Sequence, residues 1–90
     1  MNLSELLSIN LRYYRKVYNL SQEKFAEVIG TSLSHLNKIE QQKVDVKLST
    51  IEKYANNLSK FDRNKTIEPI DLLNADKSRI TNYSRIDEKK

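Results

Sequence analysis

Residues 25–40 read FAEVIGTSLSHLNKIE and contain Gly30, the one glycine in a chain of 90 residues. Apolar side chains before and after this glycine recur at the three- and four-residue spacing of helices. Glycine readily adopts the left-handed backbone conformation that ends a helix, whereas a β-branched residue would be strained there. The stretch therefore predicts two short helices joined by a tight turn at Gly30.

The side chains around this turn suit two helices that cross closely. Ala26 is small, so the helix after the turn can approach the helix before it. Leu36 and Ile39 occupy one stripe of the later helix and are expected to face back toward the earlier one. This pattern predicts a helix-turn-helix with the later helix as its recognition helix. An ordinary helical hairpin in a small bundle would use alanine and glycine in the same way.

Helical periodicity continues toward the N-terminus, and strand-like alternation is nearly absent from the chain. We expect a first helix over residues 3–17, with Asn2 and Glu5 forming a capping box at its start. Ser21 is the expected N-cap of the helix that ends at Gly30.

Further caps follow the turn. Thr31 or Ser32 is expected to cap the recognition helix, and Ser49 with Glu52 to form the capping box of a fourth helix. Pro69 suits the first turn of a short fifth helix. Each helix is too short to be stable alone, so the helices must share one core. The sequence predicts an all-α fold, a compact bundle of four to five helices.

The last part of the chain has few apolar side chains. We expect residues 1–73 to form the folded domain and residues 74–90 to form a polar tail that is disordered in isolation. Ile80, Tyr83 and Ile86 are the sizeable apolar side chains of this tail. Their spacing favours an arm that packs on a partner subunit, and the basic charge of the tail leaves open an arm that contacts phosphates.

Composition limits the classes of function. The chain has no cysteine and one histidine, so it offers neither disulfides nor a cluster of thiolate or imidazole metal ligands. It has no carboxylate pair, catalytic triad or phosphate-binding loop, which argues against an enzyme, and no cofactor is expected. There is no signal peptide pattern and no run of ~20 apolar residues, so we expect a cytoplasmic protein without a membrane span. A net charge of +4 favours a polyanionic partner such as nucleic acid.

Residues 9–58 resemble the Xre or Cro/CI type of helix-turn-helix domain, the lambda-repressor-like family of bacterial and phage regulators. The matching segments are LRYYR, LSQEKFAEVIG, LSHLNKIE and LSTIEKYANNL. The resemblance implies a lambda-repressor-like bundle that binds double-stranded DNA. Two departures stand out. Gln41 and Gln42 occupy a place where the family often has glycine, and the link to the fifth helix is longer than usual.

The resemblance also implies which side chains read the bases. These are outward or N-terminal positions of the recognition helix: Ser32, Leu33, Ser34, Asn37 and Lys38. Asparagine can pair with adenine, lysine can donate to guanine or to a phosphate, and leucine can contact thymine methyl groups. Incidental exposure is the alternative interpretation for Leu33.

Contacts to the DNA backbone and a supporting ion pair follow from the same resemblance. Gln22 begins a helix whose N-terminal N–H groups suit a phosphate, and His35 and Lys43 are expected near the backbone as well. Arg15 and Glu40 are expected to pair and thereby to hold the recognition helix in register.

Two functions remain in view. The first is a sequence-specific DNA-binding transcriptional regulator, a repressor that binds a palindromic operator as a homodimer, because one half-site discriminates poorly among genomic sites. The alternative is an antitoxin or adaptor in which residues 60–90 bind a protein partner and DNA binding serves autoregulation.

Overall fold

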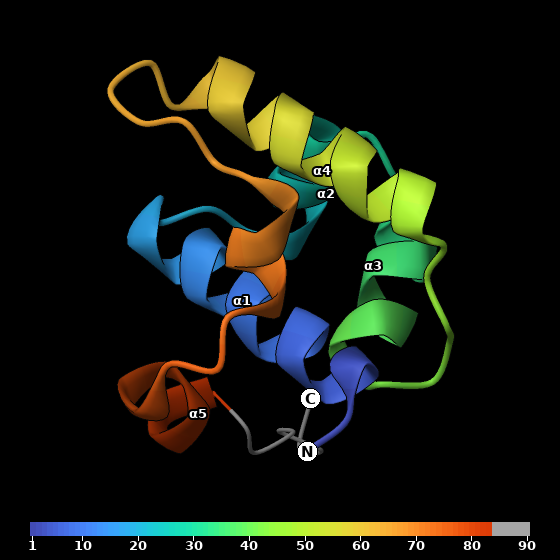
Figure 1. Ribbon diagram of the computed structural model, residues 1–90. Helices are drawn as coiled ribbons and strands as arrows, with labels where there is room; N and C mark the ends of the chain where they lie inside the picture. Colours follow the sequence, from blue (N-terminus) through green and yellow to red (C-terminus); the bar gives the residue numbers. More distant parts are fainter. Residues whose placement is uncertain (84–90) are drawn as a thin grey trace.

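The computed structural model describes residues 1–83, which form an all-α bundle without a strand in that range. Figure 1 shows the 3-10 helix η1 packed between α1 and α4, with α5 beside α1. The elements in chain order are α1 (Leu3–Val17), α2 (Gln22–Ile29), α3 (Leu33–Glu40), α4 (Leu48–Phe61), η1 (Pro69–Leu73) and α5 (Lys77–Tyr83). Ile86 and the rest of residues 84–90, where part of the expected tail falls, lie outside the described residues.

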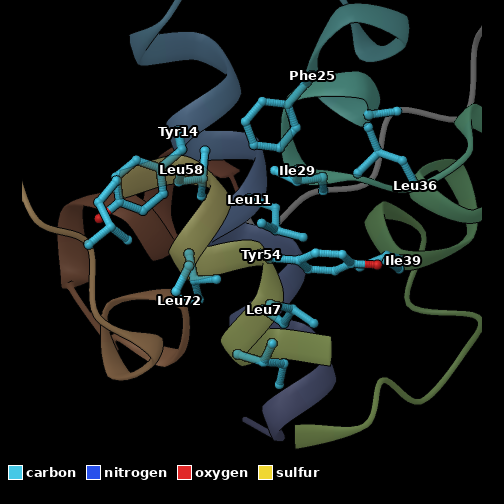
Figure 2. Close-up of a cluster of buried hydrophobic side chains, with 14 residues drawn as sticks. Leu7, Leu11, Tyr14, Phe25, Ile29, Leu36, Ile39, Tyr54, Leu58 and Leu72 are labelled. Atoms are coloured by element: carbon cyan, nitrogen blue, oxygen red, sulfur yellow. The ribbon is translucent and has the colours of Figure 1, made fainter. Parts of the chain in front are cut away.

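One hydrophobic core joins the first four helices and η1 (Figure 2). Each helix contributes one stripe of apolar side chains, as the periodicity predicts. Tyr54 of α4 and Phe25 of α2 are the largest side chains that are fully buried. The core consists of Leu7, Leu11, Tyr14, Phe25, Ala26, Ile29, Leu36, Ile39, Ile51, Tyr54, Ala55, Leu58, Ile67 and Leu72.

The predicted caps of the first three helices are confirmed. The Asn2 side chain accepts from the Glu5 backbone N–H, and the Glu5 carboxylate accepts from the Asn2 N–H. Ser21 caps α2, and Ser32 caps α3 by accepting from the His35 N–H at 3.0 Å. Pro69 begins η1 as predicted.

The predicted cap of α4 is wrong. The helix begins at Leu48, its N-cap is Lys47, and no side chain caps it. The Lys47 carbonyl accepts the first helical hydrogen bonds, so Ser49 already lies inside the first turn. The half-buried Val46 packs against the core just before this point.

Part of the expected polar tail, residues 77–83, is ordered within the chain, whereas the expectation of disorder concerns the isolated segment and stays a prediction. These residues form α5, which packs on α1. Arg79 makes the main contacts, since its Nη1 donates to Asn10 Oδ1 at 2.8 Å and its guanidinium carbon lies 3.8 Å from the centroid of the Tyr13 ring. Besides the edge-to-face contact of the Tyr13 and Tyr83 rings, the helix is docked by polar and cation–π contacts, which a count of apolar residues does not detect.

Asn10 joins three parts of the chain. It is fully buried in α1, and its Nδ2 donates to the carbonyls of Leu6, Leu72 and Asn74 while its Oδ1 accepts from Arg79. Buried amides need such partners, because an unsatisfied one is strongly destabilising. Asn10 therefore couples the fold of α1 to the chain segment from η1 to α5.

Candidate DNA interface

The turn between α2 and α3 is built around Gly30, as predicted. Its φ of +86° lies in the left-handed region. The Thr31 N–H donates to the Ala26 carbonyl at 2.9 Å and the Gly30 N–H donates to the Glu27 carbonyl at 3.2 Å. This pair of bonds forms the left-handed C-terminal cap that glycine favours. Ala26 itself is buried between the helices.

Two side chains of α4 donate hydrogen bonds to backbone carbonyls of this turn. The sequence patterns do not identify them. Asn57 Nδ2 donates to the Ile29 carbonyl at 2.7 Å, and Lys53 Nζ donates to the Gly30 carbonyl at 2.9 Å. A Cβ at position 30 would lie 2.9 Å from Asn57 Nδ2, which is too close. The four-residue spacing of Lys53 and Asn57 places them on one helix face, but such a pair is equally typical of a solvated surface.

The inner side of α3 is buried. Leu36 and Ile39 pack in the core, as predicted, and Glu40 at the end of the helix is 5% exposed. Arg15 of α1 reaches the Glu40 carboxylate with two bonds, Nε to Oε2 at 3.0 Å and Nη2 to Oε1 at 3.1 Å. The parallel geometry gives the pair orientation as well as attraction. The structure thus brings together the two residues that the family resemblance paired.

Gln22 joins Arg15 and Glu40 in one group of hydrogen-bonded side chains, the Glu40 cluster. Its Nε2 donates to Glu40 Oε1 at 2.9 Å, so the first residue of α2 also contacts the last residue of α3. Three helices therefore meet at Glu40, and the charged end of α3 has a partner on each neighbour. The sequence predicts a phosphate contact for Gln22 but not this bond to Glu40, which lies 18 residues away in the chain.

The outer side of α3 is open to solvent at its N-terminal end. Ser32, Leu33, Ser34 and Lys38 are exposed, whereas His35 and Asn37 are half-buried. Leu33 is 41% exposed, so this large apolar side chain does lie outside the core.

Lys43 is exposed in the loop that follows α3. Its backbone N–H donates to the Lys38 carbonyl at 2.9 Å, so the start of the loop folds back on the helix. Gln42 takes a positive φ of 61° here. A glutamine therefore adopts here the left-handed conformation that glycine favours.

Tyr14 of α1 and Tyr18, the C-cap of that helix, both pack against the core and have raised pKa values. Burial raises the pKa of Tyr14. Burial also raises the pKa of Tyr18, and Asp62 adds to this effect because its Oδ2 accepts the Tyr18 hydroxyl bond at 2.8 Å. Both phenols are therefore protonated near neutral pH and act as neutral packing groups.

Residues 1–83 contain no group of three or more acidic, histidine or cysteine side chains that would hold a metal ion. No helix in this same range is long and apolar enough to cross a membrane.

Comparison with known proteins adds to this geometry. Residues 11–60 match the helix-turn-helix family. The chain is similar to the control protein C.SmaI of Serratia marcescens, with 39% identity over 51 residues that cover 57% of this chain and 61% of that protein. The matched part is therefore less than two thirds of the relative's length. The structure is similar to a hypothetical transcription factor, NHTF from Neisseria, with a TM-score of 0.71, 26% identity, and coverage of 89% of this chain and 84% of that one.

These matches include the elements that build the site. The family match begins within α1, contains α2 and α3 completely, and ends within α4. The solved structure supports the lambda-repressor-like bundle over most of the chain. The chain belongs to the helix-turn-helix family of the Xre or Cro/CI type, a family of DNA-binding regulators of transcription.

Proposed function

We propose that this protein is a sequence-specific DNA-binding regulator of transcription that inserts α3 into the major groove. The observation that carries the proposal is the division of α3 into two sides. Its inner side is buried and ends at the Glu40 cluster, while its N-terminal outer side is exposed and carries hydroxyl, amide, ammonium and apolar groups. A helix whose inner face is fixed against the core and whose outer face is exposed to solvent suits readout of base edges.

The proposed base-reading residues are the exposed Ser32, Leu33, Ser34 and Lys38, together with the half-buried Asn37. Asn37 suits adenine, whose acceptor and donor match its side-chain amide, and Leu33 suits a thymine methyl group. The Ser32 Oγ already accepts from the His35 N–H, so its hydroxyl is left to donate.

The proposed phosphate contacts come from Gln22, His35 and Lys43. Gln22 uses one N–H of its amide on Glu40, and the second N–H stays available for a phosphate oxygen. Lys43 is the simpler phosphate contact, because it is exposed and its side chain is not part of the Glu40 cluster.

We further propose that the protein acts as a homodimeric repressor on a palindromic operator. One recognition helix contacts few base pairs, so a single half-site would be outnumbered by competing genomic sites. A two-fold dimer doubles the site and requires an inverted repeat. A DNA-bound dimer represses most simply by covering a promoter.

Selection of bound fragments from random DNA tests this proposal directly. We expect enrichment of an inverted repeat whose half-sites are centred about 10 base pairs apart, or a multiple of that spacing. A single unrepeated motif would contradict the dimer, and no enrichment at any salt concentration would contradict sequence-specific binding.

A further inference from the structure

Ser8 is a polar residue buried in the core, and it is not one of the proposed DNA-contacting residues. It lies in α1 and is fully buried. Its Oγ donates a 2.7 Å hydrogen bond to the backbone carbonyl of Glu40, the last residue of α3. A serine inside a helix commonly bonds to a carbonyl of its own helix, so a bond to another helix is a specific tertiary contact.

The C-terminal end of α3 explains why this bond matters. The last four carbonyls of a helix lack partners within the helix. The loop supplies three, since Gln41, Gln42 and Lys43 donate their N–H groups to the carbonyls of residues 37, 39 and 38. The carbonyl of the buried Glu40 receives its hydrogen bond from Ser8.

Ser8 and Arg15 act on the same residue from the same face of α1. They are about two helical turns apart, which places them on one stripe. Ser8 holds the backbone of Glu40, and Arg15 holds its carboxylate. Attachment at two points fixes both the position and the rotation of the end of α3 relative to α1.

The consequence of losing one attachment would appear at the other end of the helix. A rigid helix of eight residues spans about 12 Å, so a tilt of about 5° at Glu40 displaces the exposed groups near Ser32 by about 1 Å. Hydrogen bonds to base edges weaken steeply with distance and angle, whereas phosphate attraction tolerates such shifts. Discrimination between sequences is therefore more sensitive to the Ser8 bond than general affinity for DNA.

We infer that Ser8 is a positioning residue for base readout: its hydroxyl fixes the C-terminal end of α3 and thereby sets the sequence specificity of DNA binding without touching DNA. The inference rests on the proposed function and deepens it.

The test compares Ser8→Ala with a matched variant in the full chain. Ser59→Ala is the control, because the Ser59 hydroxyl also joins a helix to a carbonyl outside it, that of Ile67 eight residues further on, and it accepts from the Ile67 N–H as well. The measured quantity is the ratio of affinity for the selected operator to affinity for random DNA at one salt concentration. We expect Ser8→Ala to lower this ratio about tenfold and Ser59→Ala to leave it within about twofold, although both lower the melting temperature.

The inference is overturned if Ser8→Ala leaves the ratio of operator affinity to random-DNA affinity unchanged. It is also overturned if Ser59→Ala lowers this ratio as much as Ser8→Ala does. Ser8→Cys extends the test if the alanine variant does not fold, since it keeps nearly the same volume but replaces a strong donor with a weak one. It is expected to lower the ratio as well, and an unchanged ratio for this variant counts against the inference.

Failure of the proposed function has a different signature. If the unmodified protein prefers no DNA sequence, the regulator proposal fails and the specificity role of Ser8 fails with it. Hydrogen exchange of the α3 amides then still decides whether Ser8 holds the helix, because faster exchange in Ser8→Ala than in Ser59→Ala requires that bond.

Discussion

Gly30 determines the geometry of the turn through two separate requirements, its positive φ and the absence of a Cβ next to Asn57. We expect Gly30→Val to lower the free energy of unfolding by roughly 1–3 kcal/mol, because a β-branched residue resists this φ. Thermal denaturation measures the loss. Gly30→Ala, which lacks the branch, should lose less, and an unchanged melting temperature in the valine variant would contradict the role of the turn.

Asn37 and Lys43 separate base readout from phosphate attraction. Asn37→Ala should weaken binding to the preferred operator by ~1–3 kcal/mol and relax the preference at one base pair in each half-site. Lys43→Ala should weaken binding to all sequences by similar factors and reduce the salt dependence. Titrations with operator and random DNA at several salt concentrations distinguish these two effects.

Equal losses of affinity on operator and random DNA for both variants would contradict readout by α3. Lys43 serves this comparison better than Gln22, whose side chain also contacts Glu40.

At the scale of elements, the contact between α1 and α3 depends on the ion pair of Arg15 and Glu40. Their side chains are 14% and 6% exposed, so removal of either leaves a largely buried charge without its partner. Each single change to alanine should therefore destabilise the protein by about 3–5 kcal/mol, and the double variant should lose less than the sum of the two. Chemical denaturation of all four proteins gives the coupling energy. Strict additivity would show that the two charges act independently.

The elements themselves were largely predictable from local patterns. The caps at Asn2, Ser21 and Ser32 are hydrogen bonds between residues three apart, so their signals lie within a few residues of sequence. The predicted cap of α4 was wrong, because the helix begins at Leu48 and the backbone carbonyl of Lys47 accepts its first hydrogen bonds without a side-chain cap. Local patterns are decisive where nearby side chains interact, and they fail where the backbone alone begins a helix.

The candidate site was predictable to a similar extent. The resemblance identified Arg15 and Glu40 together, and the apolar stripe identified the buried face of α3. The bonds from Ser8, Lys53 and Asn57 to backbone carbonyls were not predictable, because a carbonyl is the same in every residue and leaves no signature in the sequence. Only the three-dimensional arrangement shows which donor meets which carbonyl.

For the whole molecule, the question is what the chain after Asn74 contributes. Truncation there removes α5, so the Tyr13 ring loses Arg79 and Asn10 Oδ1 loses its donor. We expect a lower melting temperature, because the hydrogen bond and the cation–π contact between α5 and α1 are both lost. Arg79→Ala in the full chain is the matched variant and should account for much of the loss. Equal stability of the truncated and full chains would contradict this docking role.

The same truncation tests whether the segment has a second role in assembly or in DNA binding. Loss of an arm at a dimer interface would raise the dimer dissociation constant, which sedimentation measures. Loss of a basic arm on DNA would reduce the salt dependence of binding and leave the dimer intact. A change in neither quantity would restrict α5 to docking on α1.

The hydrogen bonds of Asn10 also constrain when the protein can become active during its synthesis. The amide is buried near the start of the chain, yet three of its partners are Leu72, Asn74 and Arg79. A ribosome that has released α1 to α4 has released the whole helix-turn-helix, but the polar group at the centre of α1 still lacks those partners. The nascent chain therefore completes these bonds only after residues 72–79 have emerged as well. A fragment that ends after α4 is expected to be less stable than the longer chain, although it already carries the recognition helix.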